Sequence, residues 1–261
     1  MIVKQASNVL DLLEYFSVRQ KPASVSEISK HFDWPRSSTF NIISTLASRG
    51  YLFEPENKGS FYPASKWLSL IEIISSAAPL PKGVLNIVRE VAKRTSETVF
   101  VGSMSGMNAV IIEVVPSSYE IRYVADVGKC LPLYATATGQ AILSQLSSAK
   151  RKSVLNKVEF ESFATGTPNN KDTVEESIND SLRRGWFSSS SGYTQDLGGI
   201  SLPLVVEGRI MAITVAGPLS RIESKVSIFA KILHEETERH LGKGFIRDNV
   251  RGLETSDFLT E

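Results

Sequence analysis

One stretch, PRSSTFNIISTLASRGYL at positions 35–52, constrains this chain more than any other. At 3.6 residues per turn its buried-type positions fall on one stripe and predict a helix with a single core-facing side: Thr39, Ile42, Ile43 and Leu46. Pro35 suits the first turn of a helix, and Gly50 suits the position after its end. The opposite side carries short hydrogen-bonding side chains instead of the Glu and Lys pairs common on solvated helices. Such a side allows another surface to approach closely.

The flanking residues predict two more helices and a hairpin. A first helix is expected over residues 4–17, and a second begins at the capping-box pattern of residues 24–27. After the third helix, residues 51–53 and 60–62 are expected as short strands around a turn. Three short helices followed by a two-stranded hairpin predict a winged helix-turn-helix, in which the third helix enters the major groove of DNA.

The polar side of the third helix can then read base edges. Asn pairs with adenine, Ser and Thr bond to phosphates or bases, and an aromatic ring can contact the thymine methyl group. The residues expected to contact DNA are Arg36, Ser37, Ser38, Phe40, Asn41 and Thr45 on the helix and Lys58 on the wing. The alternative is a non-enzymatic sensor or scaffold that uses its winged helix for protein contacts.

The charge of this domain predicts assembly. Residues 1–63 hold seven Lys or Arg and six Asp or Glu, a net charge of +1, far below the basic footprint usual for DNA-binding domains. One copy would hold DNA weakly, so two or more copies on adjacent half-sites are expected. Residues 65–78 predict an amphipathic helix whose stripe of Leu68, Ile71 and Ile74 needs a partner. We expect a homodimer through the N-terminal domains, and a homotetramer through the second domains as the larger alternative.

The remainder of the chain predicts an α+β domain. Pro79 and Pro81 break the amphipathic helix and mark the boundary. The expected division is a winged helix-turn-helix at 1–64, a linker helix at 65–79, a second domain at 80–246 and a flexible tail at 247–261. Helices are expected over 82–95, 138–146, 149–155, 173–184 and 220–241, and strands over 98–103, 108–115, 120–127, 186–190, 200–206 and 209–216. Helices flanking a mostly antiparallel sheet are typical of GAF-like small-molecule sensor domains.

Composition narrows the chemistry. The 261 residues carry a net charge of +1, and no apolar run approaches the roughly 20 residues that span a bilayer, so a cytoplasmic protein is expected. Cys130 is the single cysteine, which excludes internal disulfides and multi-cysteine metal clusters and predicts a free core thiol.

No catalytic pattern is complete. The segment HEETERH at 234–240 resembles a zinc-protease helix, but position 238 is Glu where the second His is required, so a solvated helix face is expected. No glycine-rich dinucleotide or phosphate-binding motif is present. We therefore expect neither catalytic residues, nor a metal, nor a cofactor.

Three stretches, in order and spacing, resemble the IclR family of bacterial transcriptional regulators over about residues 4–245. The first is the quoted helix with its wing, and the second is VGKCLPLYATATGQAIL at 127–143. The third begins at LRRGW, 182–186, and continues through GGISLPLVVEGRIMAITVAGP at 198–218. The resemblance implies a ligand-responsive DNA-binding regulator, expected to be a repressor of a catabolic operon, acting on a near-palindromic operator.

In this family the second domain binds a small organic effector, frequently an organic or aromatic carboxylate. Carried over position by position, the effector-binding residues are Tyr123, Leu131, Ala137, Thr138, Ser189, Gly199, Thr214 and Ala216. Small residues at 135–139 start a helix whose unbonded N–H groups favour an anionic or polar group. For each position, ordinary core packing is the alternative interpretation.

The chain also departs from the family pattern. The family often has Arg at the position of Asn41 and His at the position of Tyr134. Many members have Cys in place of Gly199, and Ser is common in place of Ala216. The first departure makes base recognition less charged. The other three predict a roomier, less polar pocket, which disfavours a two- or three-carbon acid as the effector.

Overall fold

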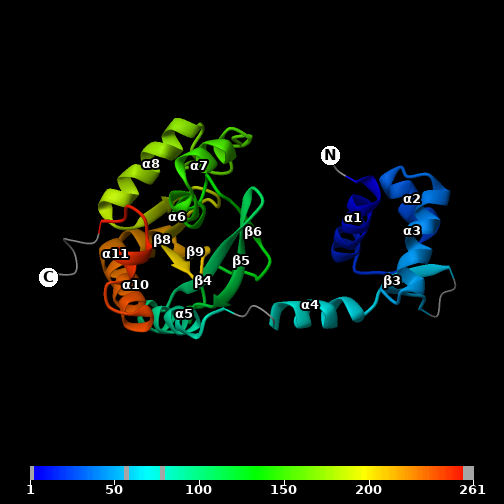
Figure 1. Ribbon diagram of the computed structural model, residues 1–261, viewed down its shortest axis with the longest axis horizontal. Helices are drawn as coiled ribbons and strands as arrows, with labels where there is room; N and C mark the ends of the chain where they lie inside the picture. Colours follow the sequence, from blue (N-terminus) through cyan, green and yellow to red (C-terminus); the bar gives the residue numbers. More distant parts are fainter. Residues whose placement is uncertain (1–2, 56–58, 77–79, 255–261) are drawn as a thin grey trace. The chain divides into compact units, whose positions relative to one another are not determined.

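The computed structural model describes residues 3–55, 59–76 and 80–254 (Figure 1). Contacts divide the chain into two compact units, Met1–Pro79 and Leu80–Glu261. Each unit has its own hydrophobic core. Along the described ranges, no helix is both long and apolar enough to cross a membrane.

The N-terminal unit is a winged helix-turn-helix, as predicted. Its elements are α1 (Lys4–Arg19), β1 (Ala23–Ser24), α2 (Val25–Phe32), α3 (Arg36–Ser48), β2 (Leu52–Phe53) and β3 (Ser60–Pro63). The three short strands form an antiparallel sheet in the order β1-β3-β2. The predicted capping box is present, because Glu27 N–H donates to Ser24 Oγ and Ser24 N–H donates to the Glu27 carboxylate.

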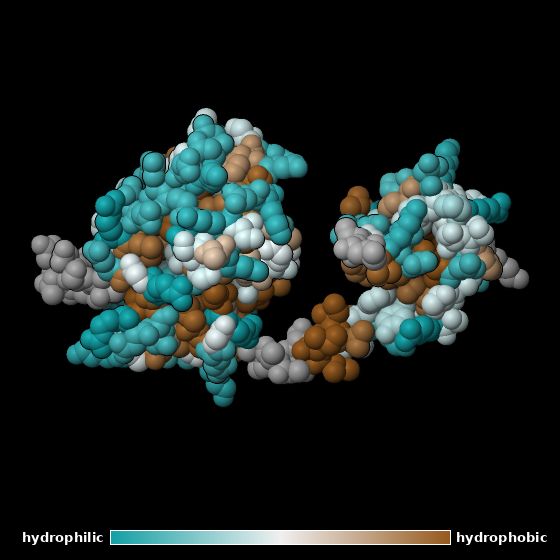
Figure 2. Space-filling model, turned by 45° about the horizontal axis from the view of Figure 1, so that its top comes forward, coloured by the Kyte–Doolittle hydropathy of each residue, from teal (hydrophilic) through white to brown (hydrophobic). Residues whose placement is uncertain are grey.

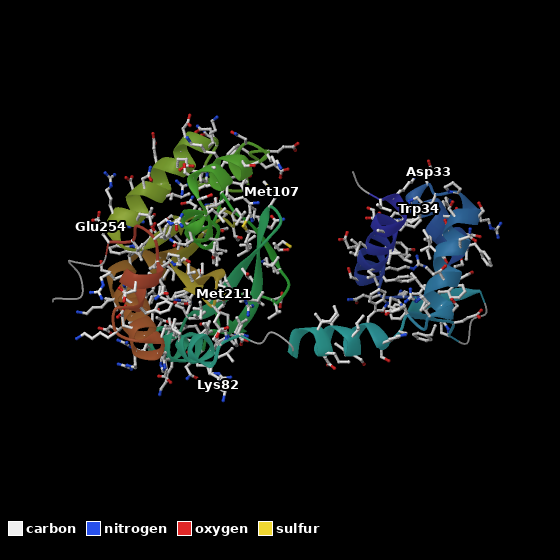
Figure 3. All side chains as sticks on the ribbon, in the orientation of Figure 1. Asp33, Trp34, Lys82, Met107, Met211 and Glu254 are labelled. Atoms are coloured by element: carbon white, nitrogen blue, oxygen red, sulfur yellow. The ribbon has the colours of Figure 1, made fainter. Side chains whose placement is uncertain are left out.

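The core of this unit sets the orientation of α3. Its buried residues come from all three helices and the strands: Leu12, Phe16, Ala23, Ile28, Ile43, Leu46 and Leu52. Trp34 lies in the turn between α2 and α3 (Figure 3), where its ring stacks on Phe32 with centroids 4.3 Å apart. Ser29 Oγ donates to the Trp34 carbonyl at 2.7 Å. These contacts fix α3 against α2 and leave its other side to solvent.

The helix that follows the wing, α4 (Lys66–Ser76), lies within the segment 65–79 predicted as a linker helix. Its first turn is tied to the unit, since Lys66 Nζ donates to the Arg49 carbonyl and Trp67 Nε1 donates to the Tyr51 carbonyl. Beyond that turn the helix exposes apolar side chains, which form a hydrophobic surface in Figure 2: Leu68, Leu70, Ile71, Ile73 and Ile74.

The C-terminal unit is α+β, with one antiparallel sheet in the order β6-β5-β4-β9-β8-β7. Its strands are β4 (Thr98–Ser105), β5 (Asn108–Val115), β6 (Cys130–Pro132), β7 (Phe187–Ser190), β8 (Leu197–Val206) and β9 (Arg209–Pro218). Its helices are α5 (Lys82–Thr95), α6 (Ala137–Gln145), α7 (Ser148–Leu155), α8 (Lys171–Arg184), α9 (Leu219–Glu223), α10 (Val226–Leu241) and α11 (Phe245–Asn249).

The helices cover both faces of this sheet (Figure 1). Helices α5 and α10 pack on each other and on one face, while α6 packs on the other face beneath α8. All residues of α6 are buried. Gly139 permits this, because a Cβ atom there would lie 2.3 Å from the Leu133 carbonyl oxygen. The start of α6 is thereby held close to the turn that follows β6.

Three predicted elements differ in the structure. Residues 120–127 are a loop and not a strand, because β6 takes the edge of β5 and side chains bind the loop backbone: Arg221 donates to the Ile121 carbonyl and Thr98 to the Tyr123 carbonyl. The helix predicted over 220–241 is two helices, α9 and α10. Part of the segment predicted as a flexible tail is packed, since α11 extends to Asn249 and both Val250 and Leu253 are buried.

Two burial predictions are wrong. Cys130 is exposed, because it lies on the edge strand β6 with its side chain on the outer side. The 234–240 segment of α10 is not a solvated face, since His234, Glu236 and Thr237 are fully buried. His234 Nε2 contacts the Gly185 carbonyl at 2.8 Å, and the Glu236 carboxylate accepts from Arg94 of α5 at 2.7 Å. Hydrogen bonds and ion pairs, which the residue pattern does not reveal, make the burial of His234 and Glu236 tolerable.

Candidate DNA-binding surface and effector cavity

The six predicted DNA-contact residues of α3 lie on one exposed side. Arg36, Ser37, Ser38, Phe40, Asn41 and Thr45 are all exposed. Phe40 keeps 57% of its surface, a high value for a large apolar side chain that has no place in the domain core. Thr39, Ile43 and Leu46 are buried on the other side. The predicted division of this helix into a core side and a solvent side is therefore what the structure contains.

The polar groups on this exposed side of α3 remain available for hydrogen bonds to a partner, because few of them are used within the described part of the chain. Thr45 Oγ1 donates to the Asn41 carbonyl at 2.7 Å, which uses its proton but leaves its oxygen able to accept. Within the described ranges, no side-chain hydrogen bond involves the Asn41 amide and no ion pair involves Arg36. The side chain predicted to contact DNA from the wing, Lys58, lies outside the described residues.

In the C-terminal unit, all eight predicted effector-binding residues line one small cavity, together with residues that the sequence did not indicate. The eight come from four strands, one loop and one helix: Tyr123, Leu131, Ala137, Thr138, Ser189, Gly199, Thr214 and Ala216. Whether they bind an effector stays a prediction, but segments almost a hundred residues apart in the chain do converge here.

Strand register explains the convergence. Ser189 pairs with Gly199 across β7 and β8, and Gly199 pairs with Ala216 across β8 and β9, so the three form one row. Because side chains of paired residues point to the same face of a sheet, the row faces α6 together with Thr214. A Cβ atom on Gly199 would lie 3.4 Å from Ser189 Oγ and 3.8 Å from Thr214 Cγ2. Gly199 thus borders space that a larger side chain would enter.

A chain of hydroxyl groups connects α6 to the sheet beside the cavity. Thr138 Oγ1 and Thr214 Oγ1 are 2.7 Å apart, and Thr214 Oγ1 donates to Ser201 Oγ at 2.9 Å. At the start of α6, Thr136 Oγ1 caps the helix by accepting from Gly139 N–H at 3.0 Å. Among the described residues that line the cavity, none carries a charge. The polarity of the cavity therefore comes from hydroxyl groups, two tyrosines and the N-terminal end of α6.

The cavity is small, with a volume of about 40 Å³. Pockets that enclose drug-sized ligands have roughly 300–1,000 Å³. The cavity is therefore too small for such a ligand without widening, and a pocket roomier than those of other family members stays a prediction. The residues that sequence reasoning missed include three that add bulk or polarity to the lining: Phe100, Thr136 and Tyr193. Phe100 joins the lining because it pairs with Thr214 across β4 and β9, and Tyr193 reaches the cavity through the path of its loop, so neither was visible in the local sequence pattern.

Tyr134, one of the departures from the family pattern, lies outside the cavity lining. Its hydroxyl donates to the Glu161 carbonyl at 2.9 Å and accepts from the Glu161 N–H at 2.8 Å. Burial raises the pKa of this phenol above its ordinary value. Tyr134 therefore anchors the segment after α7, and its identity does not set the size of the cavity.

A buried ion pair holds the loop that carries Tyr123. The Glu97 carboxylate is almost fully buried and accepts two hydrogen bonds from Arg221, at 2.6 and 2.9 Å. This bonding raises the pKa of the Arg221 guanidinium. The same guanidinium lies 4.4 Å from the centre of the Tyr119 ring and donates to the Ile121 carbonyl. The loop over 119–123 is thus attached to the sheet at the edge of the cavity.

Comparison with known proteins identifies the class and then the family. A winged helix-turn-helix joined to a helix-flanked sheet with an internal cavity defines a two-domain transcriptional regulator. Residues 5–54 match the IclR helix-turn-helix domain, and residues 68–239 match the C-terminal domain of the bacterial transcriptional regulator IclR. The chain belongs to the IclR family. The family is one of DNA-binding regulators and not of enzymes, with an effector-binding C-terminal domain.

Individual relatives agree. The transcriptional repressor IclR of Escherichia coli is 23% identical over 94% of this chain and 92% of its own. The IclR crystal structure of Thermotoga maritima has a TM-score of 0.70 and 20% identity, covering 92% of this chain and 99% of its own. An IclR homologue of Microbacterium hydrocarbonoxydans, solved with 4-hydroxybenzoate, has a TM-score of 0.74 and 21% identity, covering 89% of this chain and 95% of its own. At these identities, the structures establish the shared fold.

Proposed function

We propose that this protein represses a catabolic operon and that a small organic effector releases or resets it. The observation that carries the proposal is the exposed side of α3, where short polar side chains lie opposite a buried stripe. A repressor acts on chromosomal DNA, so we place the protein in the cytoplasm. The test is a gel shift on the DNA flanking its own gene across a range of salt concentrations. Binding that is absent at low salt would contradict the proposal.

On DNA, we assign base reading to Asn41, Ser37 and Thr45, with Phe40 against a thymine methyl group. Arg36 and Ser38 contact the phosphate backbone or bases near the start of the helix, and Lys58 contacts phosphate from the wing. Exposure of the α3 residues and the absence of acidic side chains on α3 support this assignment.

For the effector, we propose a carboxylate with an apolar body, held in the cavity between α6 and the sheet. The N-terminal N–H groups of α6 would receive the carboxylate, because no basic side chain is among the described lining residues. Hydroxyl groups of Thr138, Ser189 and Thr214 would orient it. The aromatic acid bound by the Microbacterium relative supports this ligand class. A ligand of that size must widen the cavity, so binding would couple to movement of its walls.

The required coupling is modest. Tenfold regulation corresponds to about 1.4 kcal/mol of difference in effector affinity between the DNA-competent and incompetent states. At ~25 cal/mol per Å², about 60 Å² of additional apolar burial in one state supplies it. Contact between the walls of the widened cavity and an apolar ligand body is a change of that scale.

For assembly, we propose a homodimer through the N-terminal units, with a tetramer through the C-terminal units as the larger form. The exposed apolar side of α4 supports this, since Leu68, Ile71 and Ile74 keep 64%, 58% and 62% of their surface. Two recognition helices would then meet a near-palindromic operator with half-site centres about 34 Å, or a multiple of it, apart. Sedimentation of a strict monomer at micromolar concentration, together with tight binding to one half-site, would contradict this.

A further inference from the structure

A groove of about 410 Å³ lies in the N-terminal unit between the first two turns of α1 and the exposed side of α3. One wall includes Ser38, Asn41 and Thr45, which belong to the proposed DNA-reading surface. The other wall includes Lys4, Gln5 and Asn8 of α1. The groove is therefore continuous with the surface that would face the bases, and α1 forms its far side.

Asn8 marks this groove as a place for a polar partner. Only 7% of the residue is exposed, it lines the groove, and its side-chain amide makes no hydrogen bond to any part of the chain that the structure describes. The amide atoms are not among the side-chain atoms that the described chain seals from solvent, so the amide opens into the groove and can meet a partner there. The amide can donate two hydrogen bonds and accept two.

The adjacent end of α1 is electropositive. The N-cap residue, Val3, provides no side-chain hydrogen bond, and the first turn holds no acidic residue. The unbonded N–H groups and the helix dipole of this 16-residue helix therefore add to the positive charge of Lys4. No acidic side chain is among the described groove residues. The wall formed by α1 has the chemistry that recognises a phosphate group.

We propose that the start of α1 is a second DNA-contacting element, which grips the sugar-phosphate strand beside the bases read by α3. Lys4 and the N-terminal N–H groups of α1 bind a phosphate, and Asn8 donates from the groove to the same strand. This inference rests on the proposed DNA-binding function. It also offers a partial answer to the low charge of the unit, because contacts from a helix end need few basic side chains.

The test compares Lys4→Gln and Asn8→Ala with Lys21→Gln, an exposed lysine that does not line the groove. Each full-length protein is titrated against the same operator DNA across a salt series, and its melting temperature is recorded. Lys4→Gln should weaken binding about five- to tenfold and reduce the salt slope by about one, whereas Lys21→Gln should leave both unchanged. Asn8→Ala should weaken DNA binding about threefold or more while the melting temperature stays nearly constant, because the amide makes no hydrogen bond to the described part of the chain.

The outcomes separate this inference from the function on which it rests. A wild-type protein that shows no salt-dependent DNA binding would overturn both. Wild-type binding with unchanged affinity in Lys4→Gln and Asn8→Ala would overturn the role of α1 alone. The two variants could instead change the oligomeric state seen in sedimentation while the assembled protein keeps its affinity for DNA. In that case the groove binds a second copy of the chain, and the proposal is wrong. If Asn8→Ala lowers the melting temperature and leaves the affinity for DNA unaltered, Asn8 has a structural role. That result would overturn the proposed contact between Asn8 and DNA.

Discussion

The two candidate sites of this protein are built in opposite ways. The DNA-reading surface is one side of a single helix, and six of its seven residues lie within ten positions of each other on α3. The cavity collects its lining from β4, β6, α6, β7, β8, β9 and the loops before β6 and β8. The difference implies that the helix surface tolerates change one residue at a time, whereas the cavity depends on how accurately several elements meet.

The largest expected effect comes from disturbing the packing at the start of α6, beside the cavity. Gly139→Ala should destabilise the C-terminal unit by about 3 kcal/mol, because the new Cβ would overlap the Leu133 backbone and push the start of α6 from the turn that follows β6. Urea unfolding followed by circular dichroism measures this. The matched control is Gly199→Ala, whose Cβ meets Ser189 Oγ at 3.4 Å and should cost far less. Equal losses in the two variants would show that α6 is not held as closely as described.

Filling the cavity with a larger side chain should have the next largest effect. Gly199→Leu should reduce effector affinity by about 100-fold or more, because its side chain occupies the space beside Thr214 and Ala137. DNA binding without effector should persist, since α3 lies in the other unit. Thermal shift titration with aromatic carboxylates, 4-hydroxybenzoate among them, followed by the gel shift, measures both. A Gly199→Leu protein that still responds to a ligand of the wild type would place the effector site elsewhere.

A single substitution on the helix surface should have a narrower effect. Asn41→Ala should reduce discrimination between operator and mismatched sequences by ~1–3 kcal/mol, the value of one bidentate base contact. Its stability should change little, because the side chain is exposed. Ser48→Ala, at the end of the same helix, serves as the control. If Asn41→Ala retains both affinity and sequence preference, then α3 presents a different side to DNA.

The smallest expected effect is a pH dependence confined to the C-terminal unit. Burial lowers the pKa of His234 below its ordinary value, so this histidine is neutral in the folded state. Below about pH 6.5 the unfolded chain binds a proton that the folded chain does not, and the free energy of unfolding therefore falls as the pH falls towards 5. His234→Gln should reduce that dependence in urea unfolding experiments, and His31→Gln, an exposed histidine of the other unit, should not. An unaltered pH profile in His234→Gln would assign the dependence to other groups.

Local patterns were sufficient for the N-terminal unit. Apolar spacing predicted the buried stripe of α3, and the capping box at Ser24 predicted where α2 begins. Both signals act over one or two helical turns, where sequence distance and spatial distance agree. The same local reasoning failed over 120–127, where Ile121, Tyr123, Ala125 and Val127 alternate as in a strand, but the segment is a loop with Ile121 and Val127 exposed. Alternation indicates which residues can share a face and does not provide a free strand edge to pair with.

Sequence by itself determined the order of most elements, the boundary prolines, the exposed polar side of α3 and, through a resemblance to its family, eight of the residues that border the cavity. Only the tertiary structure decided that the cavity is nearly closed, that Tyr134 points to Glu161 instead of into it, and that Asn8 of α1 lies beside Asn41 of α3. It also decided the burial of His234 and Glu236 on α10. The physical reason is that helix formation and capping depend on neighbours along the chain, whereas cavity volume and the partners of a buried polar group depend on packing between distant segments.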